Sequence, residues 1–322
     1  MSSACYWWRL ESNLWEPGPS LAQPRHRAAT LLRDGVLWLL GGRQGSTILR
    51  SNELMMFPGQ YSSLNIKHWS WIHKEMLRAA VWELEVPTAM KELPLPLMGH
   101  CALMVNNDLG WLKTEVKVWL SQYLSIVISG LVIGGGTNAL DDSGSPDPYS
   151  EALPSPHIHF YDFVNNRWIS STDNSSQLNS RAVTPLQVGR MNQACVKFSE
   201  GGRTKVMVAG GVTSSPDLEF SVARTVEVLD VQSMTWKRAM DIPASVTGSR
   251  LVVVDGRPCL VGRYGALDSP PTRALLRYSE QNTWLHLPPQ LVEGRSDYQI
   301  IRDLPTTVRS DLYLLSSYRY KA

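Results

Sequence analysis

Histidine is the residue type in this chain that most readily ligates a metal or transfers a proton near neutral pH. Of the seven histidines, only His157 and His159 are locally paired, and the alternation of a strand would place both on one face. Such a pair can ligate a metal, but two half-exposed strand residues after a proline-rich loop give the same pattern, and we expect the latter. His26 and His100 start the expected first strands of their blades, where we expect hydrogen bonds to a neighbouring turn.

The four cysteines are the next candidates for metal or redox chemistry. They lie far apart and form no C-x-x-C pair, which excludes a zinc site of the usual spacing and a dense disulfide framework. We therefore expect free, mostly buried thiols. The cysteines are Cys5, Cys101, Cys195 and Cys259.

Motifs of nucleophilic or phosphate chemistry are missing from the sequence, which has no G-x-S-x-G, P-loop or H-E-x-x-H motif. The glycines at 134–136 imitate a phosphate loop only weakly, because the polar, proline-rich segment after them cannot open a helix. Asp141, Asp142 and Asp147 lack calcium-loop spacing, so we expect them to be solvated. We therefore predict no catalytic residue, no cofactor and no metal, and hence not an enzyme.

Composition places these residues in a chain that can bury a large core. Hydrophobic residues make up 43% of the 322 residues and charged residues 19%, below the roughly 25% of ordinary soluble proteins, which excludes a disordered, charge-rich chain. The 23 glycines and 20 prolines exclude a helix bundle. The net charge of +2 gives no reason to expect a nucleic acid or a membrane as partner.

Two segments bear on localisation. Met1 to Trp8 has neither a basic nor an apolar region, so no signal peptide is visible, and we expect a cytoplasmic protein, or a secreted one if the N-terminus is truncated. Val118 to Leu140 is uncharged and long enough to span a membrane, yet its second half alternates with serine and ends in glycines. We predict there a buried strand that closes in a glycine turn.

The elements that would position these residues repeat along the chain. A β-branched or leucine-rich run that ends in paired glycines is followed by a short strand and then by a strand with a tryptophan. Each unit predicts a four-stranded antiparallel meander, which must stack on others to bury both faces. Glycine permits φ > 0 and the close approach of backbones where the second strand ends. The glycine runs are 36–42, 131–135 and 206–211, with a degraded copy at 258–263, and the tryptophans are Trp168, Trp236 and Trp284.

This pattern resembles the kelch repeat, which is marked by a diglycine that closes the second strand, an aromatic–acidic pair in the third and a tryptophan in the fourth. The resemblance implies a single all-β propeller of four-stranded antiparallel blades over residues 1–322. We expect about five blades, the last of them closed by strands from both ends of the chain. The blades are 24–97, 98–187, 188–246, 247–290 and 291–322, with 1–23 as the closing strands.

The first two expected blades are longer than a kelch unit. The excess lies in residues 61–80 and 109–124, which lack turn chemistry suited to their neighbours. These segments are either functional loops that cover the propeller or non-core insertions that do not belong to the native product, and we favour the second interpretation.

A propeller without catalytic motifs acts through loops that a rigid scaffold presents. We expect a protein-interaction scaffold that binds a protein or peptide partner through the loops after the second strands, with arginine suited to acidic or phosphorylated groups. One alternative is the substrate-recognition part of a truncated ubiquitin-ligase adaptor, and another is a copper enzyme similar to galactose oxidase. The expected partner-binding residues are Arg43, Gln44, Thr137, Asn138, Thr213, Arg263 and Tyr264.

Overall fold

The computed structural model is an all-β protein: every regular element within the described residues is a strand. None of these residues belongs to a helix long and apolar enough to cross a membrane. The predicted strand at the end of the uncharged segment is confirmed as β10 (Ser129–Ile133), which is buried from Gly130 onward. The structure describes residues 6–9, 14–17, 20–33, 36–56, 81–83, 90–105, 129–138, 152–163, 166–172, 177–178, 181–262, 275–287, 298–301 and 313–316.

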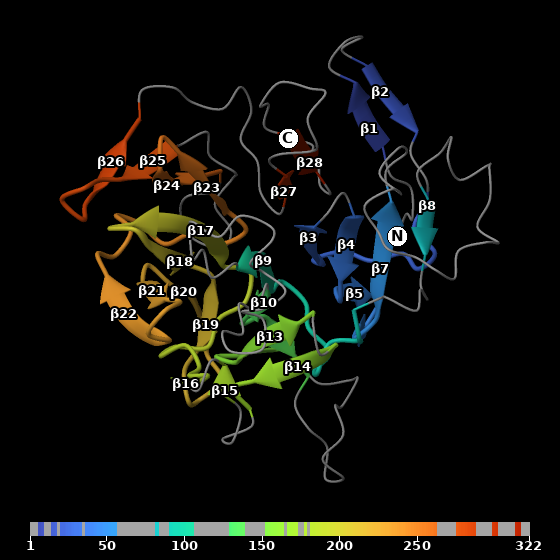
Figure 1. Ribbon diagram of the computed structural model, residues 1–322, viewed down its shortest axis with the longest axis horizontal. Coiled ribbons are helices and arrows are strands. Elements are labelled where there is room, and N and C mark those ends of the chain that lie inside the picture. The colour runs from blue at the N-terminus through green and yellow to red at the C-terminus, as the bar shows by residue number, and fades with distance from the viewer. Residues whose placement is uncertain are drawn as a thin grey trace, which may run out of the picture.

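Four four-stranded antiparallel sheets stand in a ring, like a four-bladed propeller (Figure 1). Within each sheet the strands pair in chain order, and the first strands contact one another in succession around the ring. Sheet 1 is β3 (Ala29–Arg33), β4 (Val36–Leu40), β7 (Asn52–Met56) and β8 (Val81–Glu83); sheet 2 is β9 (Cys101–Val105), β10, β13 (Ile158–Asp162) and β14 (Arg167–Ser170); sheet 3 is β17 (Ala194–Glu200), β18 (Arg203–Ala209), β21 (Val226–Asp230) and β22 (Thr235–Ala239); sheet 4 is β23 (Arg250–Val254), β24 (Arg257–Val261), β25 (Leu275–Tyr278) and β26 (Trp284–His286). A short pair, β15 (Gln177–Leu178) with β16 (Arg181–Ala182), precedes sheet 3.

Apolar side chains of facing sheets form the core. Between sheets 2 and 3, buried Leu131 and Phe160 belong to one cluster with Val206 and Leu229. Clusters of the same kind join sheet 1 to sheet 2 and sheet 3 to sheet 4. A thin sheet buries both faces only when it has a neighbour on each side, so the ring is what allows these sheets to persist.

The fourth-strand tryptophans lie in the wedges between neighbouring sheets, as predicted. Each ring packs in or against the apolar cluster shared with the preceding sheet. Each indole N–H also donates to a backbone carbonyl in the segment that leads into its own sheet, which satisfies the polar end of a largely apolar side chain. These bonds are Trp168 to Lys91 (3.1 Å), Trp236 to Thr184 (3.1 Å) and Trp284 to Met240 (3.0 Å).

The paired glycines close the second strands, as predicted. Gly210 and Gly211, after β18, have φ angles of +64° and +94°. A Cβ on Gly210 would lie 2.3 Å from Val246 Cγ2, and Gly211 N–H donates to Val246 O at 2.7 Å. Both the left-handed backbone and the close approach of the next sheet therefore require glycine. The same bond to the next sheet runs from Gly42 to Leu97 and from Gly135 to Arg190, each at 2.8 Å.

A single file of backbone hydrogen bonds links residues that lie two positions before the first strands. Gly99 N–H donates to Arg27 O at 2.7 Å, Asn192 N–H to Gly99 O at 2.7 Å, and Gly248 N–H to Asn192 O at 3.0 Å. In chain order, the four residues have left-handed φ angles of +54°, +58°, +55° and +65°. Each sheet thus donates to the sheet before it.

Within the described residues, the two ends of the chain form separate hairpins, and the expected fifth blade shared between them is not shown. β1 (Tyr6–Arg9) pairs with β2 (Leu14–Pro17), and β27 (Tyr298–Ile301) pairs with β28 (Tyr313–Ser316). A hairpin closes over a short stretch of chain and needs no contact with the distant end, so each segment pairs locally. β27 lies beside β23 on one side and β3 on the other (Figure 1).

The expected insertions, residues 61–80 and 109–124, lie outside the described residues. The strands on either side of them pair directly, β7 with β8 and β9 with β10. Each of the two segments therefore connects neighbouring strands of one sheet.

Two of the cysteines expected to be free thiols form a disulfide instead. Cys101 in β9 is bonded to Cys195 in β17, with their Cα atoms 6.2 Å apart and a sequence separation of 94 positions. The ring brings these first strands of sheets 2 and 3 together, and no local motif signals such a long-range pair. Cys259 is free and buried, as expected, and Cys5 lies outside the described residues.

Candidate functional site

A short hairpin follows the diglycine in each of the first three sheets. Each hairpin starts directly after this diglycine and forms a bridge with a residue just before the first strand of the same sheet. These equivalent positions place the three hairpins at the same end of their sheets, and we call them together the hairpin face. The hairpins are β5 (Arg43–Gln44) with β6 (Thr47–Ile48), β11 (Gly136–Thr137) with β12 (Leu153–Pro154), and β19 (Val212–Ser214) with β20 (Phe220–Val222).

The hairpin face contains every predicted partner-binding residue that is described. Arg43 and Gln44 form β5, Thr137 and Asn138 lie in and after β11, and Thr213 lies in β19. Arg263 and Tyr264 lie outside the described residues. The repeat therefore brings the predicted residues of the first three sheets to equivalent places.

Several of these side chains are occupied by contacts within their own hairpin. Arg43 Nε donates to Gly45 O at 2.8 Å, and Thr213 Oγ1 lies 3.1 Å from Ser221 Oγ. Thr213 and Asn138 are buried, whereas Arg43 is half-buried. Among the predicted residues that the structure describes, Arg43 is thus the charged side chain with surface left for a partner.

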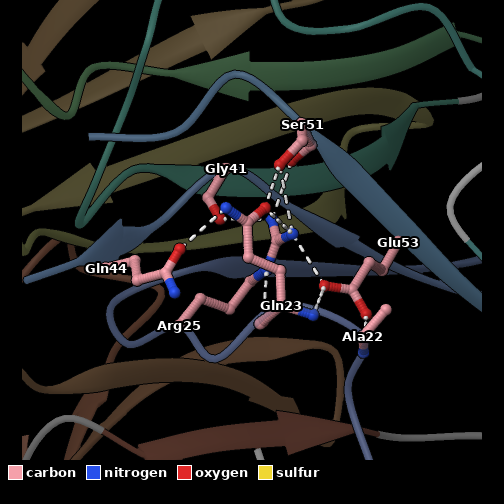
Figure 2. Close-up of polar contacts among 7 residues, drawn as sticks. All are labelled: Ala22, Gln23, Arg25, Gly41, Gln44, Ser51 and Glu53. Carbon is pink, nitrogen blue, oxygen red and sulfur yellow. Dashed lines mark hydrogen bonds and ion pairs between the residues drawn. The ribbon is translucent and has the colours of Figure 1, made fainter. Parts of the chain in front are cut away.

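A buried ion pair lies beneath the first hairpin (Figure 2). Arg25 Nη2 is 2.7 Å from Glu53 Oε1, and both side chains are fully buried. Arg25 Nη1 donates at 2.8 Å to Gly41 O and to Ser51 O. The guanidinium therefore joins the first diglycine to the entry of β7 through charge-assisted hydrogen bonds.

The carboxylate of Glu53 extends this network to the hairpin (Figure 2). It accepts backbone N–H bonds from Ala22 at 2.9 Å and Gln23 at 3.1 Å. Gln23 Nε2 in turn donates to Gln44 Oε1 in β5 at 2.8 Å. The predicted residue Gln44 is therefore held in place by the buried pair.

The same arrangement recurs in sheet 3. Arg190 Nη2 is 2.6 Å from Glu227 Oε1, and Arg190 Nη1 donates to Gly210 O at 3.0 Å and Thr225 O at 3.1 Å. Glu227 Oε2 accepts the N–H of Gln187 at 2.8 Å. Two hairpins of the face thus stand on equivalent ion pairs.

Sequence reasoning missed these pairs, although a signal was present. Arg25 and Arg190 each stand four residues before a first strand, and Glu53 and Glu227 are each the second residue of a third strand. Burial lowers the pKa of both arginines, and the neighbouring carboxylate opposes that shift. Since the ordinary pKa of arginine is so high, the guanidinium stays charged.

Sheet 2 has leucine and histidine at the equivalent positions, Leu97 and His159. The His159 ring is buried, and its Nδ1 lies 2.7 Å from Ser170 Oγ. Burial, with smaller effects of His157 and His100, lowers the pKa of His159 to about 3. The ring is therefore neutral at pH 7.

The prediction that His157 and His159 are half-exposed strand residues is correct in part. His157 is half-buried but directly precedes β13, and His159 lies in β13 but is fully buried. Within the described residues, no three His, Cys, Asp or Glu side chains are grouped so as to hold a metal. The expected side-chain hydrogen bond of His100 is not formed: its ring is buried, and neither nitrogen has a partner among the described atoms. Burial alone lowers its pKa to about 3.

The fold and the hairpin face define a β-propeller-like protein with anchored loops at one end of its sheets. Neither a scan against protein-family models nor a search of the curated proteins finds a match to this chain.

Proposed function

We propose that the chain is a kelch-type propeller that serves as a non-catalytic scaffold and binds a protein or peptide partner through the hairpin face. The kelch type is supported by the left-handed diglycines, by the fourth-strand tryptophans in the wedges and by the ring of four-stranded meanders. We also propose that the β27–β28 hairpin occupies a further position in the ring, which the contacts of β27 with β23 and β3 support.

The observation that carries the binding proposal is the buried Arg–Glu pair beneath two of the three hairpins. Loops that a rigid scaffold holds in place lose little conformational entropy when a partner binds. Protein scaffolds place binding residues on such loops more often than on strands. The half-buried guanidinium of Arg43 suits an acidic group on the partner.

Affinity capture with the full chain tests the binding proposal. We expect Arg43→Glu to lose a partner that the unmodified chain captures from its native cells. The matched control is Arg203→Glu, a mostly exposed arginine at the start of β18 and hence at the opposite end of its sheet. Equal capture by both variants and the unmodified chain contradicts binding at this part of the face.

A further inference from the structure

The β19–β20 hairpin has a three-residue loop of defined geometry. Ser215 N–H donates to Glu219 O at 2.9 Å, and Leu218 N–H donates to Ser215 O at 3.0 Å. Ser215 Oγ accepts the N–H of Glu219 at 3.1 Å, and Leu218 has a left-handed φ of +62°. A turn closed by an i to i+3 bond and followed by a left-handed residue is a standard three-residue hairpin loop, and its left-handed position normally holds glycine.

Leucine at this position is unfavourable for the loop itself. A left-handed backbone costs a residue with Cβ about 1–2 kcal/mol. Burial does not compensate, because the Leu218 side chain is 59% exposed, and Phe220, two residues on, is 39% exposed. Neither backbone preference nor packing explains this leucine.

The other non-glycine residues with left-handed backbones have an evident reason for it within the described part of the chain. Asparagine and aspartate tolerate this conformation. Met234 is buried in the core, and Arg27 belongs to the file of hydrogen bonds that links the sheets. Leu218 is the exposed aliphatic residue of the set, which comprises Arg27, Asn166, Asn192, Leu218, Met234, Asp255 and Asn282.

The charges around Leu218 indicate what it would contact. Asp217 and Glu219 flank it directly, and both are exposed. An apolar tip with an acidic border is complementary to an apolar pocket with lysine or arginine at its rim.

We propose that Leu218 and Phe220 insert into an apolar pocket with a basic rim on a partner protein. The proposal rests on the proposed function and specifies the partner surface that one hairpin of the face recognises. The backbone bonds at Ser215 hold the tip in its binding conformation before contact, so little ordering is needed. Apolar anchors that fill pockets carry most of the free energy of such interfaces.

The Leu218→Gly variant distinguishes an effect on partner binding from an effect on folding stability. Glycine relieves the left-handed strain, so we expect the thermal midpoint of unfolding to stay the same or rise. We expect affinity for the partner to fall at least tenfold. Asp217→Lys with Glu219→Lys should also weaken binding and reverse its dependence on salt. The control is Met240→Ala, which removes another exposed apolar side chain that belongs to none of the three hairpins; Met240 is 55% exposed.

The partner surface is identified with a photocrosslinker, p-benzoylphenylalanine, placed at position 218 or at position 240 of the full chain in its native cells. Adducts are mapped by mass spectrometry, and the captured protein is then purified and titrated by calorimetry. Support requires an adduct from position 218 but not 240, on apolar residues bordered by lysine or arginine, together with the tenfold loss in Leu218→Gly.

An adduct from position 218 to a second copy of this chain, to lipid or to nucleic acid overturns the proposal. Partner binding that Leu218→Gly leaves intact but Arg43→Glu abolishes also overturns it, while the proposed function stands. Failure of every hairpin variant to alter partner binding overturns both.

Discussion

Arg25 and Arg190 show how a single residue type can anchor loops from within. Each guanidinium is fully buried and faces one carboxylate, and its Nη1 atom donates to two backbone carbonyls. Charge buried in this way is tolerated only when it is paired and hydrogen-bonded. The ion pair is therefore a condition for the hairpin geometry rather than a large source of stability.

Glu227→Gln tests this condition. The substitution keeps the shape but leaves Arg190 as a buried charge without a counter-ion, so we expect the free energy of unfolding in urea to fall by about 3–5 kcal/mol. Replacement of both partners by apolar residues, Arg190→Met with Glu227→Leu, should cost less, because no lone charge remains. Glu219→Gln on the exposed loop is the control, and a loss there as large as in Glu227→Gln contradicts the interpretation.

His100 and His159 predict a pH dependence of stability. The pKa of each is lowered from 6.5 to about 3 by burial, so the unfolded chain binds protons below pH 6.5 that the folded chain does not. Stability therefore falls as pH decreases from 6.5 towards 3, by up to about 1.4 kcal/mol per pH unit for each histidine. Urea unfolding at about pH 7, 6 and 5 measures how the free energy of unfolding changes with pH. Most carboxylates titrate below this range and contribute little to the change. An equal slope in His100→Gln with His159→Gln would refute the assignment.

At the scale of elements, the two residues of each diglycine have three structural roles. They end the second strand, lead into the hairpin and donate a hydrogen bond to the next sheet. The close approach at Gly210 is what couples the hairpin face to the packing of neighbouring sheets.

Gly210→Ala should be far more damaging than a change at an equally left-handed but open glycine. A Cβ at position 210 would meet Val246 O at 2.5 Å, whereas one at Gly201, with a φ of +58°, has no atom within 4 Å. We expect Gly201→Ala to lose about 1–2 kcal/mol from its backbone alone. Gly210→Ala adds overpacking, for a total of about 3–5 kcal/mol. Chemical denaturation measures both, and equal losses would contradict the packing argument.

The elements were more predictable from sequence than the contacts between them. Paired glycines and alternating runs are local signals, and they located β4, β10 and β18 together with their turns. The Cys101–Cys195 bond and the Arg–Glu pairs depend on which strands the ring brings together, and spacing alone does not encode that. The separate terminal hairpins differ from the expectation because local pairing satisfies the same strand pattern as closure does.

At the scale of the molecule, the disulfide fixes one junction of the ring covalently. Its closed loop of roughly 95 residues lowers the entropy of the unfolded chain, a contribution of about 4–5 kcal/mol in the loop-entropy model. We expect reduction to lower the thermal midpoint, and Cys101→Ser to be insensitive to reductant. Mass spectrometry of the alkylated protein, unreduced, should show Cys101 and Cys195 protected. Two alkylated thiols there would contradict the bond and would agree with a reducing cytoplasm.

Removal of residues 298–322 tests the proposed place of β27 in the ring. The deletion strips contacts from β23 and β3, so we expect a lower thermal midpoint and self-association in analytical ultracentrifugation. Removal of residues 1–17, the β1–β2 end, is the comparison, and we expect it to have the smaller effect. A monomeric deletion variant of unchanged stability contradicts the proposed role.

The backbone hydrogen bonds that link Gly248, Asn192, Gly99 and Arg27 all run in one direction around the ring, since every N–H donates to the preceding sheet. An arc of this kind has a head and a tail that differ in chemistry. When the head of one arc joins the tail of another copy, the contact is heterologous, and its repetition yields either a closed cycle or an open fibre. In the proposed arrangement, β27 lies between β23 and β3 and so occupies the place where a second copy would otherwise join.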